Sequence, residues 1–133
     1  MKPDTFTVAE AAKLVGIEAG RIRGWQQHQH IEFGQKGLTG RYRFSLRDVR
    51  CIALMAKLVD HGIDPGRAAR QAETIVDRSR GLPFVAVFSQ ERNVSPVLIT
   101  EEATDKVSEM PVILVPLGAL FADIDARVAR RVA

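Results

Sequence analysis

The apolar positions near the start of the chain predict two short helices in succession. Residues 8–15 place their apolar side chains at the spacing of one helix face, and this segment ends at Gly16. Thr7 and Glu10 can form a capping box before it, because each side chain can bond the backbone N–H of the other residue. The stretch 19–29 repeats the helical spacing, and its inward face holds Ile22, Trp25 and Gln26. Two short helices joined by a few residues predict a helix-turn-helix, whose second helix is free to enter a DNA major groove.

Over residues 34–44 the helical spacing of apolar residues gives way to an alternation of basic and aromatic residues, and helical spacing returns after Ser45. Residues 34–44 combine three glycines with an alternating basic and aromatic run, which predicts a β-hairpin, called the wing below. Ser45 and Asp48 form a second capping-box signal before a long apolar helix that ends at Gly62. An Asp-Pro pair then starts a fourth helix over about 64–77.

The last fifty residues carry a different pattern, with short apolar runs at 84–88, 97–100 and 112–115. These runs predict strands, and 117–132 predicts an amphipathic helix. The apolar stripe of this helix consists of Leu117, Leu120, Phe121, Ile124 and Val128. Such a stripe packs either in the core of its own chain or against a second copy, and we take it as a candidate dimer contact.

These elements predict a mainly α chain with a small amount of β structure, of the α+β class. A break at Gly81–Pro83 divides it into a winged helix-turn-helix, 1–80, and a small strand-containing region, 81–133, that ends in the amphipathic helix. The second region would serve dimerisation or the binding of a partner or ligand. At 133 residues with 46% hydrophobic residues, the composition is that of a soluble globular protein.

The positive charge of the chain is concentrated in its amino-terminal part. The first 80 residues hold 14 Lys and Arg against 9 Asp and Glu, whereas the remainder holds 5 against 7. Fourteen of the 19 cations are arginine, whose planar fork suits phosphates and guanine edges. Double-stranded DNA is therefore the first partner to test.

The order of these motifs resembles the DNA-binding domain of MerR-type transcription regulators. The resemblance covers about residues 5–77 and rests on FTVAEAAK at 6–13, Gly16-Ile17, RIRGW at 21–25, the wing with RYRFS at 41–45, and Asp48-Val49. It implies a winged helix-turn-helix homodimer on a palindromic operator, with the helix at 19–29 in the major groove and the wing on the phosphate backbone. By position, Arg23 matches the arginine of the recognition helix, Trp25 its second aromatic residue, and Arg41 and Arg43 the basic aromatic segment of the wing.

The chain departs from the family pattern at three places. Arg21 stands where a small hydroxyl residue is common, and Gly24 where a tyrosine is common. The wing has the order Gly-Arg-Tyr-Arg at 40–43 where Gly-Tyr-Arg is common. The long dimerisation helix of the family is not evident after residue 77, and the cysteines with which some members sense metals are absent there.

The predicted DNA-binding residues lie either on the exposed face of the second helix or in the wing. They are Arg21, Arg23, Gly24, Gln27 and His28 on the helix, and Lys36, Arg41, Tyr42 and Arg43 in the wing. The alternative for these arginines is that they belong to an ordinary solvated surface. Gly24 serves either a close approach of the helix backbone to DNA or close packing between helices.

Other chemistry finds little support in the sequence. No phosphate loop, nucleophile elbow or defensible carboxylate pair indicates an enzyme, and no cofactor is expected. His28 and His30 lack the cysteines or acids that would complete a metal site, and Cys51 has the neighbours of a buried helical residue. We expect a cytoplasmic protein without a membrane segment.

The sequence therefore supports a sequence-specific transcription regulator, with RNA polymerase or another regulator as further candidate partners. The alternative is an excisionase-like or architectural DNA-binding protein whose carboxy-terminal region binds a partner protein or a small ligand. A regulator of the first kind needs two half-sites at fixed spacing, whereas an architectural protein can bind as monomers in tandem.

Overall fold

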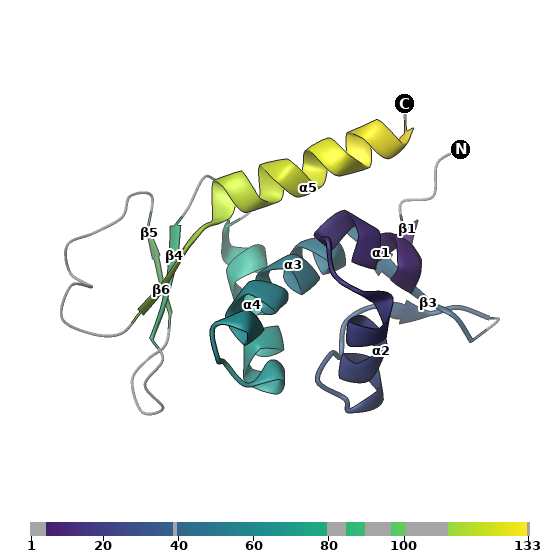
Figure 1. The fold of residues 1–133 in the computed structure, drawn as a ribbon, viewed down its shortest axis with the longest axis horizontal. Helices are drawn as coiled ribbons and strands as arrows, with labels where there is room; N and C mark the ends of the chain where they lie inside the picture. Colours follow the sequence, from purple (N-terminus) through teal and green to yellow (C-terminus); the bar gives the residue numbers. More distant parts are fainter. Residues whose placement is uncertain (1–4, 39, 80–84, 90–96, 101–111, 133) are drawn as a thin grey trace.

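The computed structural model describes residues 5–38, 40–79, 85–89, 97–100 and 112–132, and its elements follow one another in the predicted order (Figure 1). The amino-terminal elements are β1 (Thr5–Phe6), α1 (Val8–Val15), α2 (Ala19–Gln27), β2 (Gln35–Lys36), β3 (Tyr42–Ser45), α3 (Leu46–Asp60) and α4 (Pro65–Ser79). The carboxy-terminal elements are β4 (Val85–Ser89), β5 (Val97–Thr100), β6 (Val112–Pro116) and α5 (Leu117–Val132). The α+β class predicted from the sequence is confirmed.

Both predicted capping boxes are present. The Thr7 backbone N–H donates to Glu10 Oε1 at 2.9 Å, and the Glu10 N–H donates to Thr7 Oγ1 at 3.2 Å. Ser45 and Asp48 make the same reciprocal pair at the start of α3, at 3.0 and 3.1 Å. Gly16 ends α1 with φ of 86°, the left-handed conformation that glycine adopts without a steric penalty. Helix α2 is shorter than predicted: it ends at Gln27 instead of residue 29.

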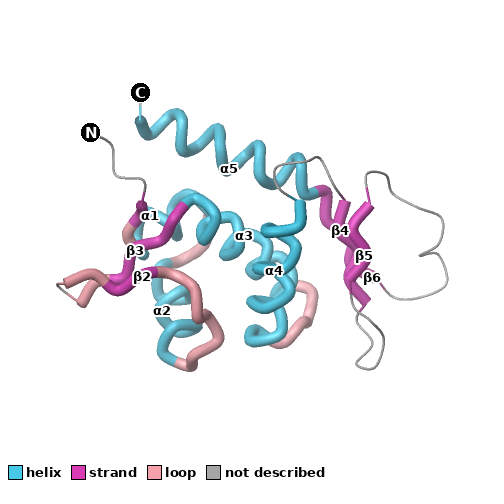
Figure 2. The backbone as a smooth tube through the Cα atoms, turned by 180° about the vertical axis from the view of Figure 1, so that it is seen from behind, coloured by secondary structure: helices cyan, strands magenta, loops and turns pink. Residues whose placement is uncertain are grey.

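Two small antiparallel sheets lie at opposite ends of the helices (Figure 2). In the first, β3 is central and pairs with both β1 and β2, so that Phe6 faces Phe44 and Lys36 faces Tyr42. Strands β2 and β3 form the predicted hairpin wing. The second sheet has the order β5-β4-β6, and its strands match the three predicted runs to within a residue or two at each end.

The hydrophobic core is centred on α3, which packs against α1, α4 and α5. The largest fully buried side chains are Phe44, Ile22, Ile52, Leu54, Met55, Leu58, Ile75, Leu117 and Ile124. Cys51 belongs to the same core, and burial raises the pKa of its thiol to about 12. The thiol therefore stays protonated at neutral pH, as a buried structural residue would.

Arg47 at the start of α3 joins this helix to α4. Its guanidinium makes two hydrogen bonds to the Asp77 carboxylate, at 2.8 and 2.9 Å, and a third to Glu73 at 3.2 Å. The bond to Arg47 holds the pKa of Asp77 below its usual value, because it favours the ionised carboxylate. This contact fixes α4 beside α3 on the side away from the wing (Figure 1).

Helix α5 returns to the amino-terminal helices and lies along α1 and α3 (Figure 1). Leu117, Phe121 and Ile124 are 0, 5 and 1% exposed, and Leu120 and Val128 are partly buried against the same core. Much of the stripe therefore packs within its own chain, and its role as a dimer contact stays a prediction for the partly buried Leu120 and Val128.

Polar contacts hold α5 in the same place. Arg50 of α3 donates to both carboxylate oxygens of Asp125 at 2.8 and 2.9 Å, and its guanidinium lies 5.6 Å from the ring centre of Phe121. Arg127 donates to the Leu14 carbonyl, close to the end of α1, at 2.6 Å. The described parts of the two predicted regions thus share one core, and α5 belongs to it.

Candidate nucleic-acid interface

The orientation of α2 follows from two buried side chains. Ile22 is 0% exposed and Trp25 is 6% exposed, so this side of the helix packs into the core. The opposite side carries Gly20, Arg23 and Gln27 in solvent at intervals of three and four residues. One face of α2 is therefore held by the protein and the other is presented outward, as the sequence predicted.

The outward face of α2 lacks side chains at two positions, Gly20 and Gly24. No other part of the described structure comes within 4 Å of the position that a Cβ would occupy at Gly20 or at Gly24. Close packing between helices therefore does not account for Gly24. Glycine inside a helix costs about 0.5–1 kcal/mol relative to alanine, and nothing in the described fold offsets this cost.

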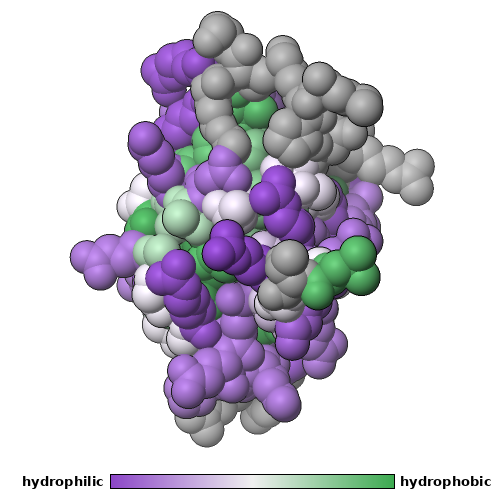
Figure 3. All heavy atoms as spheres, turned by 90° about the vertical axis from the view of Figure 1, so that its right-hand side faces the viewer, coloured by the Kyte–Doolittle hydropathy of each residue, from purple (hydrophilic) through white to green (hydrophobic). Residues whose placement is uncertain are grey.

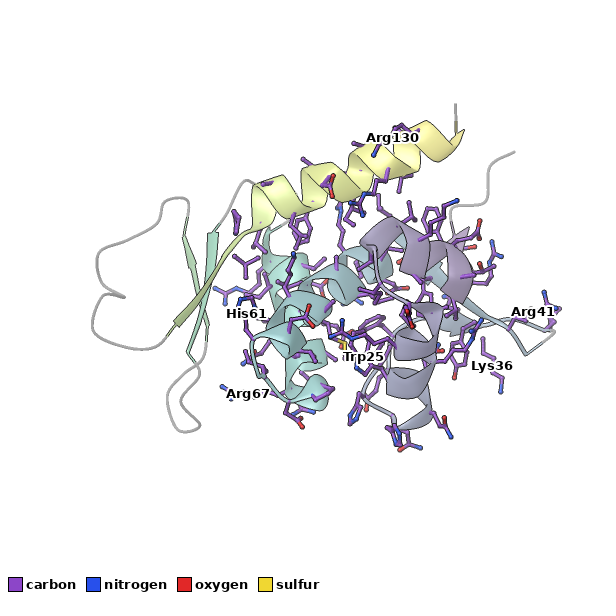
Figure 4. All side chains as sticks on the ribbon, viewed as in Figure 1. Trp25, Lys36, Arg41, His61, Arg67 and Arg130 are labelled. Atoms are coloured by element: carbon purple, nitrogen blue, oxygen red, sulfur yellow. The ribbon has the colours of Figure 1, made fainter. Side chains whose placement is uncertain are left out.

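The wing lies beside α2 and carries cations at its surface. Lys36 and Arg41 are exposed, and Figure 4 shows both on the hairpin, with Arg41 toward its outer end. Tyr42 follows Arg41 with 38% of its surface exposed. Neither cation has an ion pair with another described residue, so both are available to an external anion.

A cleft of about 560 Å³ separates the wing from α2 and the start of α1. Among the described residues its lining consists of Thr7, Val8, Ala9, Arg23, Gln26, Arg41 and Tyr42, none of which is an acid. Arg23 thus faces the same space as Arg41, although 18 residues separate them in the sequence. The amino end of α1 adds the positive end of a helix dipole to this space.

Gln26 lines this cleft, although the sequence pattern predicted that it lies on the inward face of the helix. It is partly buried, and its Nε2 atom lacks a hydrogen-bond partner within the described part of the chain. A buried amide donor without a partner is costly, so a ligand oxygen in the cleft would satisfy it. The helical spacing alone could not find this role, because it places Gln26 on the boundary between the two faces.

Two of the predicted contact residues are engaged within the protein instead. Arg21 makes an ion pair with Asp60 of α3 at 2.6 Å, and its guanidinium lies 5.0 Å from the ring centre of Trp25. Arg43 donates from its Nε to Thr5 Oγ1 and from an amino group to the Thr5 carbonyl, both at 3.0 Å. Arg21 therefore fixes α2 against α3, and Arg43 ties the wing to β1, so neither guanidinium joins the cleft.

The remaining candidates lie at the far end of α2. Gln27 is exposed, and His28 caps the helix and is exposed as well. The ring centres of His28 and His30 are 5.9 Å apart. Among the described residues, no group of three or more His, Cys, Asp or Glu could hold a metal ion.

The structure thus brings together part of the predicted set. Arg23, Arg41 and Tyr42 share the cleft, Lys36 extends it along the wing, and Gly24 and Gln27 form the outward face of α2. None of the described helices is long and apolar enough to span a membrane. The arrangement is an exposed helix face beside a cationic hairpin, with the cleft of about 560 Å³ between them. Such a surface fits a nucleic-acid backbone and groove.

Comparison with known proteins agrees with this geometry. The family model described as MerR HTH family regulatory protein matches residues 6–73, about half of the chain and all of the helix-turn-helix and the wing. No curated protein matches the chain.

One similar solved structure is the crystal structure of HiNmlR, described as a MerR family regulator lacking the sensor domain, bound to promoter DNA. The two sequences are 29% identical over 54% of this chain and 58% of that chain, with a TM-score of 0.46. The match thus spans less than two thirds of that relative.

Proposed function

This chain belongs to the MerR helix-turn-helix family of DNA-binding regulatory proteins, and we propose that it acts as a homodimer on a palindromic operator. Helix α2 enters the major groove in each half-site, and the wing lies on the neighbouring phosphate backbone. Two half-sites read by such a dimer are separated by about 34–36 Å or a multiple of it.

The observation that carries the proposal is the cleft between α1, α2 and the wing. It joins Arg23 from the recognition helix to Arg41 from the wing, and none of its described lining residues is an acid. A phosphate in this cleft would meet two guanidinium groups, the buried amide of Gln26 and the amino end of α1. Such contacts set the register of the protein on DNA, whereas Gln27 and the bare face of α2 are placed for the base edges.

We also propose that the two parts of the chain have different functions. Residues 1–80 form the DNA-binding unit, and the strand-containing part of 81–133 supports dimerisation or the binding of a partner. Three residues of the apolar stripe of α5 are buried in the core, and its partly buried Leu120 and Val128 remain candidates for this role. RNA polymerase or another regulator is a further partner of the DNA-bound dimer in this proposal.

The experiment that tests the function is selection of genomic DNA fragments by the purified protein, with light scattering of the free protein and of the complex. We expect a palindromic motif bound by a dimer. Weak binding without a motif, by monomers in tandem, would replace this proposal with the architectural one.

Replacing Arg23 by alanine should weaken binding to the selected site. If Arg23 meets a phosphate, the slope of log affinity against log salt concentration should fall by about one unit. If it contacts a guanine, discrimination at one base position should fall by about 1–3 kcal/mol. Affinity and slope are measured by fluorescence anisotropy over a series of salt concentrations.

The matched control for Arg23 is Arg67→Ala. Arg67 is an arginine of α4 on the side away from the wing (Figure 4), so its loss removes the same charge without touching the cleft. Equal effects of the two substitutions would mean that only the net charge of the protein matters, and would remove Arg23 from the interface.

Replacing Gly24 by alanine should change stability and binding in opposite directions. The free energy of unfolding should rise by about 0.5–1 kcal/mol, because alanine favours the helix and the added methyl group meets no other atom. DNA affinity should fall, because the methyl group holds the helix backbone away from the groove. Urea unfolding and anisotropy measure the two effects, and a variant that is more stable and binds as well as before would contradict the close approach.

A further inference from the structure

The outer end of the wing carries an apolar side chain that is fully exposed. Leu38 has a relative exposure of 110%, the highest of the large hydrophobic residues in the described chain. It lies in the turn that closes the hairpin, where the Gly40 N–H donates to the Gly37 carbonyl at 2.9 Å and the Gly37 N–H donates to the Arg41 carbonyl at 2.8 Å. The positive φ of Gly40, 80°, is the conformation that this type of hairpin turn requires.

The position of Leu38 is not explained by folding. A leucine in a hairpin turn exposes apolar surface to water, and the turn itself is made by the glycines on either side. The hairpin is nevertheless well anchored at its base, because Phe44 of β3 is 0% exposed in the core. The base of the wing is thus fixed in the core, whereas Leu38 is exposed at its outer end.

The surroundings of Leu38 are cationic. Lys36 precedes the turn and Arg41 follows it, both exposed, and the segment 34–43 contains three cations and no acid. Figure 3 looks at the end of the molecule from which the wing projects, and the coloured surface there is mostly hydrophilic with few apolar groups. An apolar side chain between two free cations is complementary to a surface that is anionic on both sides of an apolar slot.

We propose that Leu38 enters the DNA minor groove as an apolar wedge while Lys36 and Arg41 hold the phosphates of the two strands that border the groove. The inference rests on the proposed function, since it needs α2 in the major groove. The amino-terminal arm of a homeodomain reaches the minor groove next to its recognition helix, and a hairpin that projects beside α2 is placed in this proposal in the same way. Leucine is one of the side chains that proteins insert between base pairs from this groove, where they unstack a step and kink the duplex.

Charge distinguishes DNA from the other occupants of such a site. A second copy that placed its own wing here would bring cations against Lys36 and Arg41, and like charges would repel. DNA offers stacked bases bordered by phosphates, which satisfies the leucine and both cations at once.

The wedge has a consequence for sequence preference. Pyrimidine–purine steps such as TA and CA unstack more easily than other steps. The protein should therefore favour one of these steps where the wing lies, although no side chain there reads a base by hydrogen bonds.

The test uses the full chain and the best DNA site from the selection, with 2-aminopurine placed at successive steps of the minor groove that hydroxyl-radical footprinting assigns to the wing. The wild-type protein should raise the 2-aminopurine fluorescence at one step, because unstacking relieves quenching. Leu38→Ala should abolish this rise and weaken binding by about tenfold, which equals about 1.4 kcal/mol. Leu38→Met should retain both, because methionine also serves as a wedge.

Two further measurements separate the wedge from other roles. Leu38→Ala removes no charge, so the salt dependence of binding should be unchanged, whereas Lys36→Ala should lower the salt slope by about one unit. The stability of Leu38→Ala in urea should equal that of the wild type, because the side chain is fully exposed.

The outcomes that would overturn the inference differ from those that would overturn the proposed function. Wild-type protein that selects no DNA site would refute the function itself. Wild-type protein that binds its site without a fluorescence rise, or Leu38→Ala that binds as tightly as wild type, would refute the wedge alone. A dimer that dissociates on the Leu38→Ala change would assign the residue to an interface between copies instead.

Discussion

Replacing Ile124 by alanine should lower the free energy of unfolding by about 2–5 kcal/mol. Ile124 is 1% exposed although it lies on the terminal helix α5, and the side chains around it belong to the core of the helix-turn-helix region. The shortened side chain loses its burial and leaves a cavity, because α5 is held on both sides by the contacts of Arg50 and Arg127. Since small domains are stable by only about 5–15 kcal/mol, this single change should remove a large share of the stability.

Urea unfolding followed by circular dichroism, at two protein concentrations, measures this effect. The matched control is Arg130→Ala, which truncates an exposed residue of the same helix and should change stability by no more than about 0.5 kcal/mol. If the loss of stability grew as the protein was diluted, the stripe of α5 would be assigned to an interface between copies, because only association depends on concentration.

Replacing Phe44 by alanine should lower the free energy of unfolding by about 3–5 kcal/mol. Phe44 is fully buried on the central strand of the first sheet, opposite Phe6, and meets the edge of the Phe33 ring with centres 6.4 Å apart. Because this side chain anchors the wing to the core, its loss should also weaken DNA binding by loosening the position of Arg41.

The strand supplies the control for Phe44. Tyr42 lies two residues earlier, where it is partly exposed in the cleft, so Tyr42→Ala should affect binding far more than stability. Urea unfolding and DNA affinity are measured for both variants. Similar unfolding midpoints for the two would mean that the wing is not fixed by the core, and would weaken every inference that uses its position.

The functional surface depends on the division of arginines between structural and free roles. Arg21 and Arg23 are two residues apart on α2, yet Arg21 pairs with Asp60 and Arg23 opens onto the cleft. Arg41 and Arg43 show the same contrast in the wing, because Arg41 precedes β3 and lines the cleft, whereas Arg43 lies within β3 and bonds to Thr5. Composition counts all four as basic, and only their partners separate those that hold the fold from those available to DNA.

Most of the secondary structure could be predicted because its signals are local. The capping boxes of α1 and α3 lie within four residues, Gly16 ends α1 through its own backbone freedom, and the apolar spacing within 117–132 defines the amphipathic helix. Such signals act between near neighbours in the chain, so they can be recognised without the rest of the fold. The end of α2 was placed two residues too late, because no glycine or proline marks it in the sequence.

The sequence by itself therefore determined the order and type of the elements, the basic character of the amino-terminal part and the resemblance to a DNA-binding family. The tertiary structure alone decided that much of the stripe of α5 is core and that Arg21 and Arg43 are engaged within the protein. It alone also decided that Gln26 lines the cleft and that Leu38 is fully exposed. These outcomes depend on contacts between distant residues, such as Arg127 with Leu14 across 113 positions and Arg21 with Asp60 across 39. Periodicity fixes which face of a helix is apolar, but the identity of what covers that face depends on how the whole chain packs.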